Sequence, residues 1–343
     1  MRKLPEKFKP VFSKCLILGF SLLLGLLLSE AILRITPSLR QKYSLKMFTT
    51  KFSPLQWLDN PGVSYKFKHS KLLGHQRVPN CAPDINSYGL IGDEFKRKKP
   101  PHIFRILVLG DSIAAQNYFV DFLRKKLNRF SEAKKFQVIN AGVGSYQLWH
   151  YLRFLQYKGV KLNPDMVLIS LSLDDARLDK YTCYKTGEGV EIYSIFASRL
   201  FDYGFFNLSL FRKSYLYRVF VVALENILSA KEYDPKEKAV ANLSKMKKIS
   251  QKIKAPLFAF IWPALIRYQD YSQWEKKQYH LLTNSLKEAD IDYLDLSEVL
   301  PQGRRGELRE RKLDYVHPSP EAHYMATQAI FNYIIKHYRK YLE

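Results

Sequence analysis

The chain has 343 residues, 47% of them hydrophobic, and a formal net charge of +23. This composition excludes a disordered chain and leaves room for one large domain or two small ones. The basic residues are spread along the whole sequence without zinc-finger spacing or an aromatic RNA-binding signature. We therefore expect no nucleic-acid partner, and an anionic neighbour such as lipid headgroups or acidic glycans instead.

The N-terminus combines a basic start with an apolar run. Residues 1–14 hold five lysines and arginines against one acid, and residues 15–28 carry no charge. We expect a basic cytoplasmic segment at 1–14, a transmembrane anchor at 15–36 and an extracytoplasmic remainder. One alternative is a cleaved signal peptide with Ser29 and Ala31 at the processing site. The other is a buried core helix.

The next segment, residues 37–102, is expected to be an irregular lead-in that ends in the solvated basic stretch KRKKPPH. Apolar strand patterns then alternate with amphipathic helix patterns. This alternation predicts a parallel sheet covered by helices on both faces. We expect strands at 104–109, 136–140, 165–173, 256–262 and 291–296, and helices at 118–128, 147–158, 236–253, 273–288 and 320–337.

Residues 176–235 interrupt the alternation with a segment rich in tyrosine and phenylalanine, and 215–228 within it predicts an apolar helix. The segment is either a helical insertion with a small core of its own or a lid that shapes a pocket for an acyl group or a glycan. A lid beside an anchor could also touch lipid. Cys81 and Cys183 could pair in an exported domain, although their spacing does not decide this.

Polar residues follow the predicted strands at four places. In parallel sheets, ligands bind beyond the carboxyl ends of the strands, where the strand order reverses. Each group has a structural explanation, such as a glycine turn, an aspartate cap or a histidine before a helix-initiating proline. Their common edge favours one shared site instead. The four stretches are LGDS (109–112), NAGVGSY (140–146), SLDD (172–175) and LDYVHPSPEAHYMA (313–326).

The last stretch places Asp314 three residues before His317. This spacing can turn the carboxylate towards Nδ1 of the imidazole and leave Nε2 free to face Ser112. We see no cluster with metal-ligand spacing and no glycine-rich phosphate loop, so we expect neither a metal nor a cofactor.

These four blocks resemble those of the SGNH, or GDSL, hydrolases, a family named for a Ser, a Gly, an Asn and a His in four blocks. LLLSEAILRI and INSYGLIGDE (85–94) look most like its membrane-anchored bacterial branch. The resemblance covers about 85–175 and 236–338. It implies a flavodoxin-like three-layer α/β/α sandwich at 103–343, preceded by a transmembrane helix. It also implies a bacterial inner membrane, with this domain facing the periplasm.

The resemblance also implies roles for residues. Ser112 would be the nucleophile, His317 the general base and then acid, and Asp314 the group that orients the imidazole. The oxyanion would be held by the amide of Ser112, by an amide of the second block at Gly144 or Ser145, and by a side chain at Asp174. This chain departs from the family in two places. The family's glycine aligns best with Ser145, and its asparagine falls on Asp174, where an ionised carboxylate has no proton to donate.

We therefore expect a membrane-anchored extracytoplasmic serine esterase that removes O-acyl groups from an envelope glycan or lipid through an acyl-Ser112 intermediate. If a glycan hydroxyl replaces water, the same chemistry makes an O-acyltransferase. Because Asp174 compromises the oxyanion hole, a catalytically silent glycan-binding or assembly module is a further alternative. A phospholipid-directed lipase is another, and it would need an apolar groove under residues 176–235.

Overall fold

The computed structural model describes two compact units, which we call the helical unit and the sheet unit. The helical unit groups the N-terminal helices with the helices of the insertion, and the sheet unit holds the central sheet and the helices around it. The described residues are 9–44, 49–50, 67–70, 72–131, 134–176, 181–186, 189–194, 207–232 and 235–342.

The helical unit contains α1 (Lys9–Ile35), α2 (Pro37–Lys42), α7 (Leu208–Lys213) and α8 (Tyr215–Glu232). The stretch Leu16–Ile35 is long and apolar enough to cross a membrane. Its large apolar side chains are 47–75% exposed, from Leu24 to Ile35, which disfavours the alternative of a buried core helix. Helix α8 confirms the apolar helix expected at 215–228.

Glu30, in the last turns of the largely apolar α1, binds the start of α8. Its carboxylate accepts hydrogen bonds from the Ser214 hydroxyl at 2.9 Å and from the amides of Tyr215 at 3.0 Å and Leu216 at 2.8 Å. It also pairs with Arg34 at 2.8 Å. The first amides of a helix have no partner within the helix, so this carboxylate satisfies them and joins segments far apart in the sequence.

The sheet unit is built on five parallel strands in the order β10-β9-β6-β4-β5. The chain moves from β4 to β5, then returns to the other side of β4 and continues outward. The strand order therefore reverses between β4 and β6, as in flavodoxin-like sheets. The strands are β4 (Ile103–Leu109), β5 (Lys135–Asn140), β6 (Met166–Leu171), β9 (Leu257–Ile261) and β10 (Tyr293–Asp295), each within two residues of the expected position.

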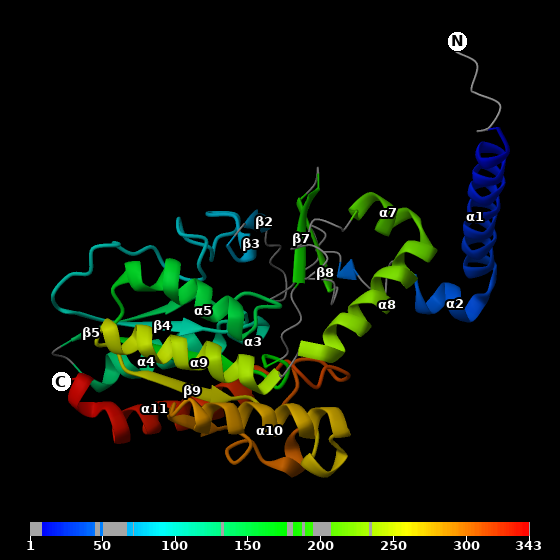
Figure 1. Cartoon of the computed structure of the whole chain (residues 1–343). Coiled ribbons are helices and arrows are strands. Elements are labelled where there is room, and N and C mark those ends of the chain that lie inside the picture. The colour runs from blue at the N-terminus through cyan, green and yellow to red at the C-terminus, as the bar shows by residue number, and fades with distance from the viewer. Residues whose placement is uncertain are drawn as a thin grey trace. The chain divides into compact units, whose positions relative to one another are not determined.

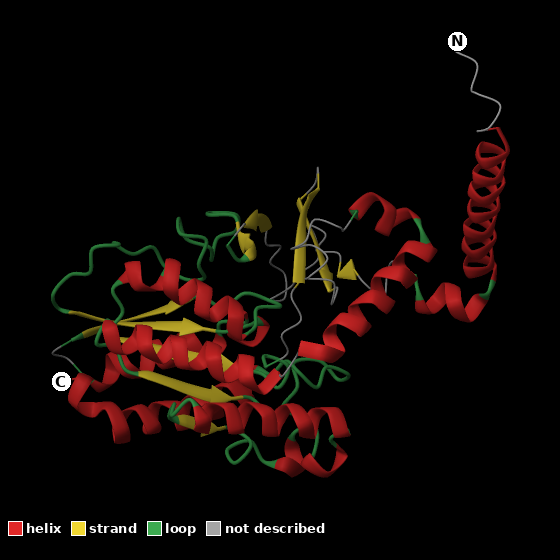
Figure 2. Ribbon diagram, viewed as in Figure 1, coloured by secondary structure: helices red, strands yellow, loops and turns green. Residues whose placement is uncertain are grey.

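Helices cover both faces of this sheet (Figures 1 and 2). One face carries α4 (Tyr118–Phe130) and α11 (Pro320–Leu342), and the other carries α5 (Leu148–Tyr157), α9 (Pro235–Lys252) and α10 (Gln273–Glu288). Ile106 and Val108 are alternate residues of β4, and both belong to the core beneath α4 and α11. The expected three-layer α/β/α sandwich is confirmed, with α11 five residues longer than expected.

Several expectations for the connecting segments are wrong or untested. The lead-in is not irregular throughout, because β2 (Phe67–Ser70) and β3 (Gly74–Arg77) form an antiparallel hairpin, and Ile91 bridges to the end of β5 at Asn140. The insertion contains the unexpected strands β7 (Tyr181–Thr186) and β8 (Gly189–Ser194), which form a small sheet with β1 (Thr49–Thr50) of the lead-in. The side chain of Cys183 and most aromatic side chains of the insertion lie outside the described residues, and Cys81 is a free thiol.

Candidate active site

Strand β4 ends at the point where the strand order reverses, and Ser112 follows it as the first residue of α3 (Ser112–Ala115). Asp111 caps this short helix, because its carboxylate accepts a hydrogen bond from the Ile113 amide at 2.9 Å. The structural explanation of the Gly-Asp-Ser turn is therefore correct for Asp111. It leaves the Ser112 hydroxyl available for a partner across the sheet edge.

Ser112, His317 and Asp314 form one hydrogen-bonded chain. The Ser112 Oγ lies 2.8 Å from Nε2 of His317, and Nδ1 of the same ring lies 2.8 Å from Oδ2 of Asp314. Partial burial raises the pKa of Asp314, but hydrogen bonds from the His317 amide and ring and from the Val316 amide outweigh it and hold that pKa below its ordinary value. Asp314 therefore stays ionised at neutral pH, where it fixes the proton of the imidazole on Nδ1.

Backbone contacts hold the loop that carries His317. The Glu310 amide donates to the carbonyl of His317 at 2.9 Å, and the Leu265 amide donates to the carbonyl of Tyr315 at 2.7 Å. Ser319 closes the loop as a helix cap, because its hydroxyl accepts from the Ala322 amide at 3.3 Å. These contacts position the imidazole from the segments that follow β9 and precede α11.

Gln116 is a residue of this site that sequence reasoning missed. It is 5% exposed, and its side-chain nitrogen donates to the carbonyl of Pro318 at 3.2 Å. Its side-chain oxygen lies 3.0 Å from Nε2 of the buried His323. Burial lowers the pKa of His323 to about 3, so the neutral ring donates this bond. Gln116 thus connects the turn of α3 to the loop that carries His317. In the sequence, this role is indicated only by the position of Gln116, four residues after Ser112.

The three backbone amides expected to hold the oxyanion, those of Ser112, Gly144 and Ser145, have no hydrogen-bond partner among the described residues. Ser145 has a φ of 65°, in the left-handed region that favours glycine, and this is the position where the family pattern has its glycine. Gly142 must be glycine for packing, because a Cβ there would lie 2.5 Å from that of Ala114.

The β2–β3 hairpin clamps the loop that carries these amides. Arg77 is 2% exposed and donates through its guanidinium to the carbonyl of Gly142 at 2.6 Å. The ring of His75 lies with Nε2 at 3.0 Å from the carbonyl of Gly144. Burial lowers the pKa of His75 to about 4, so the ring is neutral, and Nε2 carries its proton because a carbonyl only accepts. The sequence gives only a weak indication of these two contacts, because His75 and Arg77 stand at alternate positions of a strand of four residues.

Three carboxylates gather where β6 ends. Asp175 is buried and accepts from the Ser172 amide at 2.7 Å and from the Tyr151 hydroxyl at 2.9 Å. Burial, together with the charges of Asp111 and Asp174, raises the pKa of Asp175 well above its ordinary value. Burial and the charge of Asp174 likewise raise the pKa of Asp111 to about 6. The third of these carboxylates, Asp174, accepts a hydrogen bond from the Ser172 hydroxyl at 2.8 Å.

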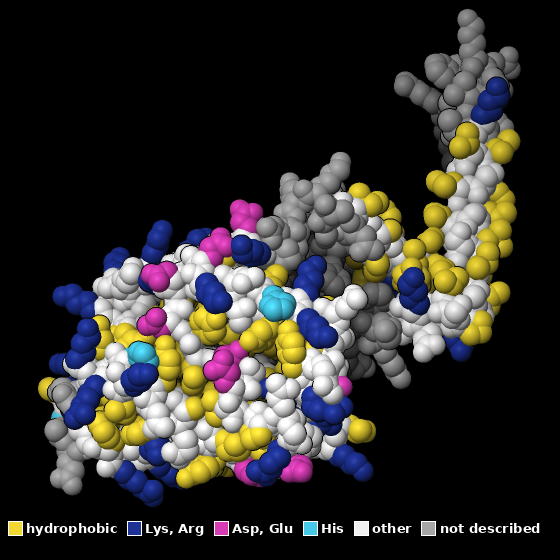
Figure 3. Space-filling view, turned by 90° about the horizontal axis from the view of Figure 1, so that it is seen from below, with side chains coloured by type: hydrophobic (Ala, Val, Ile, Leu, Met, Phe, Trp, Pro, Cys, Tyr) yellow, Lys and Arg dark blue, Asp and Glu magenta, His cyan; other side chains and the backbone are white. Residues whose placement is uncertain are grey.

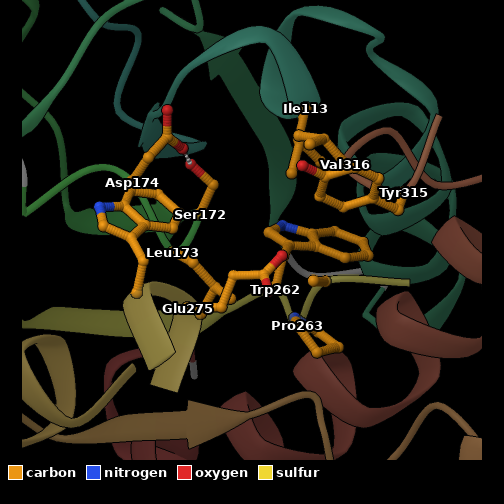
Figure 4. Close-up of a pocket in the computed structure, with 11 residues that line it drawn as sticks. Ile113, Ser172, Leu173, Asp174, Trp262, Pro263, Glu275, Tyr315 and Val316 are labelled. Carbon is orange, nitrogen blue, oxygen red and sulfur yellow. Dashed lines mark hydrogen bonds between the residues drawn. The ribbon is translucent and has the colours of Figure 1, made fainter. Parts of the chain in front are cut away.

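A cavity of about 350 Å³ opens beside the hydrogen-bonded chain. Ile113, the neighbour of Ser112, and Val316, the neighbour of His317, both line it. Figure 4 shows Asp174 and Ser172 on one side of this cavity, with Ile113, Val316 and Tyr315 grouped across from them. The lining also includes Leu173, Trp262, Pro263, Ala264, Trp274 and Glu275.

The solved structures that this chain resembles share little sequence identity with it. No family model matches it, and no curated protein matches it. A lipase/acylhydrolase from Enterococcus faecalis is 17% identical, with a TM-score of 0.42, 67% of this chain and 95% of that chain covered. An α/β hydrolase from the metagenome of Lake Arreo, Spain, is 11% identical, with a TM-score of 0.42 and coverages of 67% and 94%.

A mutant of an acetylxylan esterase from Geobacillus stearothermophilus is 13% identical, with a TM-score of 0.41 and coverages of 67% and 94%. At these identities and TM-scores, the chemistry of the site has to be inferred from its own geometry. That geometry joins Ser112, His317 and Asp314 at the switch point of a parallel sheet.

Proposed function

We propose that this chain is a membrane-anchored serine esterase of the SGNH type, which removes acyl groups from an envelope glycan or lipid outside the cytoplasm. The observation that carries the proposal is the chain of hydrogen bonds from Ser112 through His317 to Asp314, with both distances at 2.8 Å. A serine, an imidazole and a carboxylate in this order are the parts that nucleophilic acyl transfer needs.

The reaction proceeds in two balanced halves. Nε2 of His317 takes the proton of Ser112 as Oγ attacks the ester carbonyl, and the imidazolium that forms is stabilised by Asp314. The amides of Ser112 and of Gly144 or Ser145 hold the oxyanion. As the tetrahedral intermediate collapses, His317 returns the proton to the leaving alcohol. Water then attacks acyl-Ser112 with the same base, which releases the acid and restores the serine.

The N-terminal helix supports the membrane part of the proposal. The stretch Leu16–Ile35 is long and apolar enough to span a bilayer and follows a basic segment. Basic residues stay on the cytoplasmic side, so the sheet unit would be extracytoplasmic, in the periplasm if the membrane is a bacterial inner membrane. Protease accessibility of the sheet unit in spheroplasts tests this orientation, and retention of residues 1–36 in the purified protein tests an anchor against a cleaved signal.

A catalytically silent glycan-binding module is the second candidate, because Asp174 occupies the position where the family pattern has an amide donor. Labelling with a fluorophosphonate, which needs an activated serine, separates the two. We expect labelling of the wild type, loss of it in Ser112→Ala and His317→Ala, and hydrolysis of short acyl esters by the wild type alone. An unlabelled but folded wild-type protein that binds glycan would instead identify a binding module. Transfer of the acyl group to an added glycan would identify an acyltransferase.

A further inference from the structure

The cavity beside Ser112 carries acid side chains and aromatic walls. Asp174 and Glu275 both line it, with Trp262, Trp274 and Tyr315. Among the described residues that line it there is no lysine, arginine or histidine. In Figure 4, Glu275 lies beside the Trp262 indole, and Asp174 lies across the cavity from Tyr315. The chemistry of this lining is that of a cation-binding wall.

This lining contrasts with the rest of the molecule. The chain has 55 lysines and arginines against 32 acids, and basic side chains are spread over the face seen in Figure 3. The acid side chains of the lining, Asp174 and Glu275, have no basic residue beside them among the described residues that line the cavity. The site is therefore locally anionic within a cationic protein. An anionic substrate group such as a phosphate or a uronate would be repelled there.

The local negative charge conflicts with the chemistry of ester cleavage. The tetrahedral intermediate develops a negative charge at the carbonyl oxygen, and a carboxylate at the Asp174 position opposes that charge instead of donating to it. Asp174 accepts a hydrogen bond from Ser172, so it is held at the cavity wall. A positive charge on the substrate, close to the reacting carbonyl, removes this conflict because it pairs with Asp174 and offsets its field.

We propose that the esters handled here carry a cationic nitrogen, an ammonium or quaternary ammonium, within a few bonds of the ester carbonyl, and that Asp174 is the residue that selects it. This inference rests on the proposed esterase function. The nitrogen can belong to the acyl group, as in an aminoacyl ester, or to the alcohol, as in an amino-alcohol ester. The shared chemistry is a compact cation against two carboxylates and aromatic faces, which attract it through their π systems.

Pairs of esters with matched shape provide the test. For the acyl side, the p-nitrophenyl ester of glycine is compared with p-nitrophenyl propionate, in which a methyl group replaces the ammonium. For the alcohol side, acetylcholine is compared with 3,3-dimethylbutyl acetate, in which a carbon atom replaces the quaternary nitrogen. We expect kcat/KM to favour the cationic member of at least one pair by about tenfold, and this preference to shrink as the salt concentration rises.

Asp174→Asn tests the assigned residue. The amide has a similar shape, removes the charge and restores a donor, so we expect the preference to fall to about twofold while the rate on the neutral esters rises. Asp290→Asn is the matched control. It makes the same change at a side chain 94% exposed, at the opposite end of the sheet, with a φ of 51° that asparagine tolerates. It should leave the preference unchanged.

Glu275→Gln gives a second variant in case Asp174→Asn does not fold. Glu275 forms a capping box with Ser272, and glutamine serves equally well in that box, so the helix start is retained while the charge is lost.

Protection of Ser112 from a fluorophosphonate by choline, but not by 3,3-dimethylbutanol, would support the inference without turnover. Equal kcat/KM within both ester pairs would overturn it and leave the esterase proposal standing. Absence of fluorophosphonate labelling would overturn the esterase proposal itself.

Discussion

Arg77→Met tests whether the β2–β3 hairpin positions the loop that carries the amides of Gly144 and Ser145. The wild-type guanidinium donates to the carbonyl of Gly142 at 2.6 Å from a side chain that is 2% exposed. A buried hydrogen bond from a charged donor contributes about 1.5–3 kcal/mol, and methionine fills much of the same volume without replacing it. The carbonyl of Gly142 is then left without this donor, and the loop that carries the amides of Gly144 and Ser145 loses one of its two clamps.

The rate effect follows from the worth of an oxyanion donor. Removal of one donor costs about 10²–10³ in rate in other acyl-transfer enzymes, and a loosened donor should cost part of that. We expect kcat on p-nitrophenyl acetate to fall by about tenfold to a hundredfold, with KM within about twofold, because the defect concerns the transition state. The assay is steady-state kinetics alongside a denaturation curve for each variant.

Arg105→Met provides the matched control for this experiment. Arg105 is also fully buried and donates to backbone carbonyls, including that of Lys96 at 2.8 Å, but it lies near the start of β4, at the opposite end of the sheet. The Arg105→Met variant should lose about as much stability as Arg77→Met and keep the kcat of the wild type. Equal kcat values for the two variants would refute a positioning role for Arg77 and leave it a purely structural residue.

Three further predictions concern the same site. Asp314→Asn should lower kcat by about 10²–10⁴, because the amide no longer holds the proton of the imidazole on Nδ1, and unchanged kinetics would remove Asp314 from the mechanism. Gln116→Leu should lower kcat by about tenfold, because the loop that carries His317 loses its hydrogen bond from Gln116 and shifts. Thr327→Val on α11 is the control: the buried Thr327 hydroxyl donates to a carbonyl of its own helix, so this variant should keep its kcat. Burial lowers the folded-state pKa of His323 to about 3, below an unfolded value of about 6.5, so its stabilising contribution is complete above pH 6.5 and declines as the pH falls. Between pH 7 and pH 5, this shift lowers the free energy of unfolding by about 2 kcal/mol. Urea denaturation at the two pH values should therefore show a smaller decrease for His323→Leu than for the wild type. Equal decreases for the two proteins would contradict the burial argument.

Much of the sheet unit could be predicted because its central strands are buried on both sides and read as nearly continuous apolar runs. Met166–Leu171 is buried at every position, and its short, nearly continuous apolar run is typical of a strand at the centre of a parallel sheet. The positions of Ser112, Asp314 and His317 followed from the strand ends and from one short spacing. The structure brings these three together as that spacing predicts, although their catalytic roles stay a proposal.

What the sequence did not reveal are contacts between polar residues far apart in the chain. His75 and Arg77 lie in a four-residue strand that is too short for a periodic pattern, and their partners are carbonyls, which carry no signature in the sequence. Gln116 depends on the carbonyl of Pro318, about two hundred positions away. Glu30 looks like an interruption of an apolar helix until its partners at the start of α8 are known. Such side-chain-to-backbone contacts depend on tertiary geometry rather than on local propensity.

Trapping of the acyl-enzyme tests the central proposal most directly. The wild-type protein is mixed with p-nitrophenyl acetate, quenched in acid during the first turnovers, digested and analysed by mass spectrometry. We expect an acetyl group on the peptide that contains Ser112, its absence in Ser112→Ala, and a p-nitrophenol burst that matches its amount. Ester turnover without any acyl group on Ser112, or with the acyl group on another residue, would contradict the proposed mechanism.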